Sequence, residues 1–214
     1  MTLHQRDLDA LWDFSDPAGS EARLREAAGV ETDAATRAEL ETQVARALGL
    51  QERFTEGDAV LDAIPADLAA QSPAVHVRVL LERGRLRNSA GDADAAAALF
   101  REAVDAASAS PDLVFLRVDA LHMLAIADPS RTAEGTAQAF AALDGVDDPR
   151  TLRWRVSLHN NAGWDHFEEA RFEEALAEFE RAKDAAVRWG TPLQVQWADD
   201  AIAEAKAAIT DRRG

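Results

Sequence analysis

Prolines preceded by helix-capping residues recur at a fixed interval, and they constrain this chain more than any other feature. Six of the seven prolines directly follow Asp, Ser or Thr, whose side chains cap free N–H groups at the start of a helix. Proline suits the next position because its missing N–H would have no partner there. Three of these starts, at Pro73, Pro111 and Pro149, are 38 residues apart. This interval predicts a repeat of paired α-helices.

The best-defined repeat runs from Leu158 to Lys183. Small residues stand where two helices must approach closely, and aromatic residues fill the space between them; the pattern is Gly163, Phe172, Ala175, Phe179 and Ala182. This spacing resembles the tetratricopeptide repeat (TPR), a helix-turn-helix unit. The resemblance implies a right-handed superhelix whose first helices line a concave groove that holds a peptide or a segment of a partner protein.

We therefore expect an all-α, TPR-like solenoid of about eleven helices. Four helix pairs are predicted, at 34–66, 73–110, 111–146 and 149–190, and the third of them is degenerate. A helical cap is expected over 1–33 and a capping helix over 191–214.

Aromatic residues mark both predicted caps. Trp12 and Phe14 are expected to cover the first end of the solenoid, with a separate docking motif as the alternative. At the other end, Trp197 lies on an apolar stripe that we expect to pack the last helix onto the fourth repeat. Exposure of this Trp-rich end for assembly is the alternative.

Composition limits the partners. The 214 residues carry a formal net charge of −16, which disfavours general binding to nucleic acid or to anionic membranes. The chain has no cysteine, which excludes disulfides and thiolate metal sites. No apolar run reaches the ~20 residues of a membrane span, and the charged amino terminus lacks the apolar core of a secretory signal. We expect a cytoplasmic protein.

Equivalent positions on the predicted first helices form a polar stripe. Counting back from the anchor residues of the second helices gives one column of Gln43, Glu82, His122 and Asn161, and a second column, three residues on, of Arg46, Arg85, Ala125 and Trp164. Steps of three and four residues keep side chains on one helix face. The candidate binding residues are Gln43, Arg46, Glu82, Arg85, Asp119, His122, Asn160, Asn161 and Trp164.

Two interpretations of this stripe stay open. Arg46 and Arg85 can pair with one ligand carboxylate while Trp164 offers a flat surface. Asn161 matches the asparagine with which peptide-clamping TPR proteins hold their ligand, but the lysines of those clamps are missing and Glu82 adds an acid, which disfavours an acidic C-terminal tail as ligand. Alternatively, the stripe is a solvated surface on which Glu82 pairs with Arg46 or Arg85.

Four further segments resemble a group of small bacterial TPR proteins. They are Leu11 to Pro17 (LWDFSDP), Leu80 to Arg85 (LLERGR), Asp119 to Ile126 (DALHMLAI) and His159 to Trp164, where His159 replaces a tyrosine. This resemblance supports the architecture and implies a shared groove, and it carries no activity with it.

Chemical candidates are few. Asp119 and His122 lie about one helical turn apart and form the carboxylate–imidazole pair that orients a general base, so a hydrolase-type enzyme is a remote alternative. His159 and His166 share a helix face, but a metal requires three or four convergent ligands. We expect no metal, no cofactor and no enzymatic activity.

The sequence thus predicts an adaptor or scaffold that binds a protein or peptide segment in its groove. The alternative is a structural subunit that assembles through its convex face or its Trp-rich C-terminal end. A homo-oligomer is compatible with either hypothesis.

Overall fold

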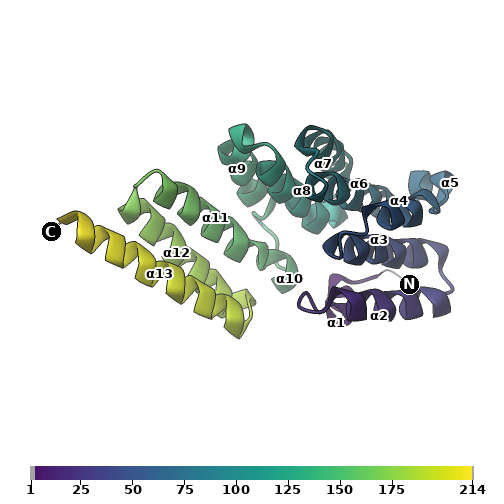
Figure 1. Cartoon of the computed structure of the whole chain (residues 1–214), viewed down its shortest axis with the longest axis horizontal. Helices are drawn as coiled ribbons and strands as arrows, with labels where there is room; N and C mark the ends of the chain where they lie inside the picture. Colours follow the sequence, from purple (N-terminus) through teal and green to yellow (C-terminus); the bar gives the residue numbers. More distant parts are fainter. Residues whose placement is uncertain (1–2, 214) are drawn as a thin grey trace. The chain divides into compact units, whose positions relative to one another are not determined.

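A computed structural model describes residues 3–213, and all of their regular structure is helical, with no strand. The predicted all-α class is therefore confirmed. Met1, Thr2 and Gly214, which belong to the two predicted caps, lie outside the described residues. The chain divides into two compact units, 1–135 and 136–214 (Figure 1), and the division falls inside the third predicted helix pair.

Unit 1 is built mainly from long helices packed in sequence order. Its elements are α1 (Gln5–Leu11), α2 (Pro17–Val30), α3 (Ala34–Leu50), α4 (Phe54–Asp62), α5 (Ala66–Gln71), α6 (Pro73–Ser89), α7 (Ala93–Ser108), the 3₁₀ turn η1 (Pro111–Leu113), α8 (Val114–Ala127), the 3₁₀ turn η2 (Pro129–Arg131) and the start of α9 (Thr132–Ala142). Helix α3 packs on α2, α4 and α6, while α7 packs on α6 and α8. This order leaves one side of α3, α6 and α8 available for polar side chains.

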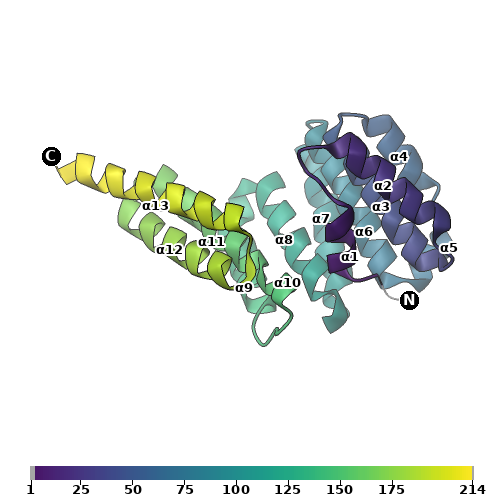
Figure 2. The same ribbon diagram turned by 90° about the horizontal axis from the view of Figure 1, so that it is seen from below.

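Unit 2 contains a layer of three long helices. After the end of α9 come α10 (Pro149–Leu152), α11 (Trp154–Glu168), α12 (Phe172–Trp189) and α13 (Pro192–Arg213). Helix α12 packs against both α11 and α13, and the three lie side by side in Figures 1 and 2.

The predicted capping residues fix most helix starts. Side chains that accept a hydrogen bond from a backbone N–H of the following turn are Asp16, Ser72, Ser110, Asp148 and Thr191, at 2.9, 3.5, 3.4, 2.8 and 3.2 Å. Asp128 is the exception, because its carboxylate accepts from the Ser130 hydroxyl instead. The proline at each of these positions opens its helix or 3₁₀ turn, as predicted.

Glycines facing aromatic rings hold the helix pairs together. A Cβ atom added to Gly84 would lie 2.4 Å from the ring of Phe100, and one added to Gly163 would lie 2.4 Å from the ring of Phe179. Both phenylalanines are fully buried. The small-residue and aromatic spacing therefore does mark two closely packed helices, α6 with α7 and α11 with α12.

Two expectations about helices are wrong in detail. The first helix of the fourth predicted pair (149–190) is broken at Arg153, which separates α10 from α11, and α5 is an additional short helix. Helix α13 packs through Ala201, Ile202 and Ala205, whereas Trp197 stays 57% exposed. The division into four helix pairs and their assignment as TPR repeats stay predictions.

Candidate functional site

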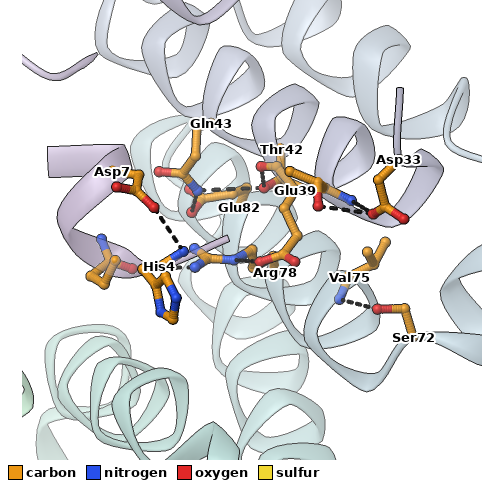
Figure 3. Close-up of polar contacts among 12 residues, drawn as sticks. His4, Asp7, Asp33, Glu39, Thr42, Gln43, Ser72, Val75, Arg78 and Glu82 are labelled. Atoms are coloured by element: carbon orange, nitrogen blue, oxygen red, sulfur yellow. Dashed lines mark hydrogen bonds and ion pairs between the residues drawn. The ribbon is translucent and has the colours of Figure 1, made fainter. Parts of the chain in front are cut away.

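The polar stripe predicted on the first helices exists in unit 1 as a connected network. We call Gln43, Arg46, Glu82, Arg85, Asp119 and His122 the first-helix stripe; α3 contributes the first two, α6 the next two and α8 the last two. The Gln43 amide donates to Glu82 Oε1 across 3.2 Å, as Figure 3 shows. Gln43 and Glu82 are only 2% and 1% exposed, so this bond is buried between α3 and α6.

Arg85 connects the next pair of helices. Its guanidinium donates to Glu82 Oε1 at 2.7 Å and to Asp119 Oδ1 at 2.5 Å. Two acids of the chain thus already bind Arg85, and its expected pairing with a ligand carboxylate stays a prediction. The alternative pairing with Glu82 is confirmed, but the pair is buried rather than solvated.

Arg46 differs from Arg85 although it occupies the equivalent position. Its guanidinium carbon lies 5.6 Å from the ring centroid of Trp12 and 5.4 Å from that of Phe14. The two rings stack on each other at 4.9 Å and 6°. Within the described residues, no hydrogen bond or ion pair is formed by the half-buried Arg46 side chain. Its contacts are cation–π contacts, which leave its N–H donors available.

The pKa values of Arg46 and Arg85 are also shifted in opposite directions. Burial lowers the pKa of Arg46, and the positive charge of Arg85 adds to that effect. Burial also acts to lower the pKa of Arg85, but the carboxylates of Asp119 and Glu82 outweigh it and raise that pKa. Arg46 is thus the cation of the stripe that an additional anion would stabilise most.

A second buried ion pair extends the stripe by one helical turn. Arg78 Nε donates to Glu39 Oε2 at 2.9 Å, with side chains only 7% and 9% exposed (Figure 3). This pair was not predicted from the sequence. A signal was present, because Glu39 and Arg78 lie four residues before Gln43 and Glu82 and so share their helix face. Burial raises the pKa of Glu39 despite the charge of Arg78.

The N-terminal segment, residues 4–14, covers part of this surface. Arg78 Nη2 donates to Gln5 Oε1 at 3.2 Å, and Trp12 Nε1 donates to Gln43 Oε1 at 3.3 Å. Leu8 between them is fully buried in a cluster with residues of α2 and α3. Trp12 and Phe14 were expected to cover the end of the helix array, but their rings lie over Arg46. The N-terminal segment therefore occupies part of the first-helix stripe.

The remaining candidates belong to unit 2 and are described separately. Trp164 packs edge-on against Phe167 and Phe179, with ring centroids 5.4 and 5.0 Å apart. It therefore packs against the core of unit 2 while staying partly exposed, and its expected role as a flat ligand-binding surface stays a prediction. Asn160 and Asn161 are half-buried on the same helix, and a role for them in binding stays a prediction.

The chemical alternatives are catalysis by Asp119 and His122 on α8 and binding of a metal ion. Asp119 is held by Arg85, and burial lowers the pKa of His122 although Asp119 opposes the shift. A catalytic role for this pair stays a prediction. Within residues 3–213, no group of three or more His, Asp or Glu side chains is placed to hold a metal ion. No helix in this range is long and apolar enough to cross a membrane.

Comparison with known proteins finds a similar fold and no matching family. No protein-family model matches the chain, and no curated protein sequence matches it. The crystal structure of BtubC (BKLC) from P. vanneervenii is similar, with a TM-score of 0.68 and 14% sequence identity over 95% of this chain and 85% of that chain. At this identity the likeness concerns the fold alone.

Proposed function

We propose that this protein is a non-enzymatic, cytoplasmic TPR-like adaptor that binds a protein or peptide segment along the first-helix stripe. The regular helix starts, the glycine–aromatic packing and the likeness to the BtubC fold support a helical array of this kind. Paired helices with polar side chains on their first members provide a preformed surface, on which several shallow contacts add up.

A single observation carries the proposal, namely the contrast between Arg46 and Arg85. Arg85 is paired with Glu82 and Asp119, whereas the half-buried Arg46 contacts the Trp12 and Phe14 rings and forms no hydrogen bond or ion pair with a described residue. Burial lowers the pKa of this guanidinium although Glu82 and Asp119 oppose the shift, so a further anion at Arg46 would be stabilising. A carboxylate on a polypeptide is such an anion, because it can accept two parallel N–H bonds from arginine.

Glu82 offers a complementary group. Its Oε1 atom accepts hydrogen bonds from Gln43 and Arg85, but its buried Oε2 atom accepts none in the described part of the chain. Buried carboxylate oxygens normally have a donor. A segment that displaces Trp12 or shifts Arg46 would bring backbone or side-chain N–H groups within reach of this oxygen. A polypeptide supplies both the acceptor for Arg46 and the donor for Glu82.

Capture from a lysate of the source organism tests this proposal. Wild type, Arg46→Lys and Arg46→Gln are compared with Arg101→Gln, a matched loss of charge on the exposed side of α7. We expect partners of wild type to be retained by Arg101→Gln and lost from Arg46→Gln. Arg46→Lys should give intermediate capture because lysine keeps the charge but cannot form the bidentate pair. Equal capture by all four proteins would contradict a role for the stripe.

A second function is favoured by the exposed apolar residues of α13. Leu193 and Trp197, one turn apart, are 52% and 57% exposed, which is unusual for large apolar side chains. A structural subunit that assembles through this end accounts for them. Light scattering over a range of concentrations tests it: the mass should rise for wild type and not for Trp197→Ala. A constant monomer mass would exclude self-assembly.

A further inference from the structure

A pocket in unit 2 has features that the proposed adaptor function does not use. Its volume is about 440 Å³, within the usual range for small-molecule sites. It lies between α11, α12 and the segment that follows α9. The residues that line it are Leu143, Gly145, Val146, Leu152, Arg155, His159, Arg181, Asp184, Ala185, Arg188 and Trp189.

Arginines outnumber acids in the lining of this pocket. Its lining includes three arginines and one acid, Asp184, whereas the chain as a whole has 39 acidic and 23 basic side chains. Arg181 and Arg188 are seven residues apart on α12 and therefore share one helix face, and Arg155 of α11 lies across the pocket from them. An acidic protein has thus collected basic side chains around one cavity.

These arginines are available to a ligand to different degrees. Arg188 is exposed, lies 5.9 Å from the ring centroid of Trp189, and forms no hydrogen bond or ion pair with a described residue. Arg155 makes a long contact of 3.5 Å with Asp144, whose side chain is 79% exposed. Arg181 pairs with Glu178 while remaining 59% exposed. Exposed pairs of this kind contribute little stability, so an anionic ligand can replace them.

The floor of the pocket is apolar. Leu143 and Ala185 are 1% and 5% exposed, and the half-buried Leu152, Val146 and Trp189 complete the surface. One wall is formed by His159, whose Nδ1 lies 2.7 Å from Glu178 Oε2 and whose ring packs on Phe140 at 4.5 Å. A ligand that fits must therefore combine an apolar body with an anionic group that reaches the rim.

We propose that this pocket binds a small organic anion, with its apolar body between Leu143, Ala185 and Trp189 and its carboxylate or phosphate group at Arg155 and Arg188. Guanidinium groups recognise both kinds of anion through paired N–H donors. The site is independent of the first-helix stripe, since it consists of residues of unit 2 alone.

Isothermal titration of the full chain with matched probes tests this inference. The probes are 4-phenylbutyrate, phenyl phosphate, inorganic phosphate and 4-phenylbutylamine, the last of which keeps the apolar body and reverses the charge. We expect one of the two aromatic anions to bind at least tenfold more tightly than both the amine and inorganic phosphate. The tighter aromatic anion identifies the head group.

Variants locate the binding site. Arg155→Gln with Arg188→Gln should weaken the preferred anion at least tenfold, whereas Arg6→Gln with Arg101→Gln, a matched loss of two exposed charges in unit 1, should leave its affinity unchanged. Arg188→Gln alone, which removes no internal pair, provides the same test if the double variant does not fold. Binding of the amine as tightly as the anions, absence of anion binding, or equal affinity in all variants would overturn the proposal.

Discussion

At the scale of single residues, the arrangement around Arg85 shows why the first-helix stripe is ordered before any ligand arrives. One guanidinium is shared by Glu82 of its own helix and Asp119 of α8, and both carboxylates are almost fully buried. Burial would raise the pKa of Asp119, but Arg85, followed by Arg46, outweighs it and lowers that pKa. Asp119 therefore stays charged, and both carboxylates depend on Arg85 for their pairing.

Removal of Arg85 should be costly for this reason. We expect Arg85→Ala to lower the free energy of unfolding by about 3–5 kcal/mol, because it leaves two buried carboxylates without their cation. Arg83→Ala on the same helix is the control, since its pair with the 64%-exposed Asp62 should contribute no more than about 1 kcal/mol. Urea denaturation followed by circular dichroism measures both. Similar losses in the two variants would contradict a buried network.

His159 predicts a dependence of stability on pH. Burial lowers its pKa, and the nearby Glu178 opposes this only in part. A histidine whose pKa is lower in the folded protein favours folding above its unfolded pKa of about 6.5, and this contribution is lost as the pH falls towards the folded pKa. Between pH 7.5 and 5.5, wild type should therefore lose more stability than His159→Gln, by less than about 1.4 kcal/mol per pH unit. Equal changes in melting temperature for wild type and His159→Gln over this pH range would contradict a lowered pKa of His159.

Only part of the site was predictable at this scale. Helical spacing placed Gln43, Glu82 and Arg85 on one surface, because the repeat keeps them in register across helices. The spacing could not show that Arg85 pairs with Asp119, since that contact depends on the distance between α6 and α8. It also could not place Trp12 and Phe14 over Arg46, because the path of residues 4–14 depends on tertiary contacts of Gln5 and Leu8.

At the scale of helices, packing follows the sequence closely where a glycine faces an aromatic ring. Gly163 of α11 allows the ring of Phe179 on α12 to lie where a side chain would otherwise stand. Capping residues define most helix starts equally well. The break at Arg153 carries no comparable signal, since no glycine or proline marks it.

Substitution of Gly163 tests this packing. Gly163→Ala should destabilise unit 2 by about 1–3 kcal/mol, because the added Cβ would meet the buried Phe179 ring at 2.4 Å. Gly29→Ala is the opposite control: nothing lies within 4 Å of its added Cβ, so the better helix propensity of alanine should stabilise α2 by up to about 1 kcal/mol. Thermal unfolding of both variants measures the difference. An unchanged or raised melting temperature for Gly163→Ala would show that the helix contact is not close.

At the scale of the whole molecule, the all-α class followed directly from the repeated helix starts, but the division of the chain did not. The boundary at 135/136 falls inside α9, within the pair that was predicted as degenerate. Composition disfavours nucleic acid and anionic membranes as partners and does not identify the ligand. The binding function is therefore argued from the stripe, where Arg46 is covered by a segment of the same chain.

This arrangement makes Phe14 the best position for a direct test of binding. The side chain is 61% exposed and lies against Arg46, so the larger, photo-reactive benzoylphenylalanine can replace it with its added benzoyl group in solvent. The same residue placed at the exposed position 101 on α7 serves as the control. In a lysate of the source organism, we expect light to crosslink a polypeptide partner to position 14 and not to position 101. Equal crosslinking from the two positions, or none from position 14 while partners are still captured, would contradict it.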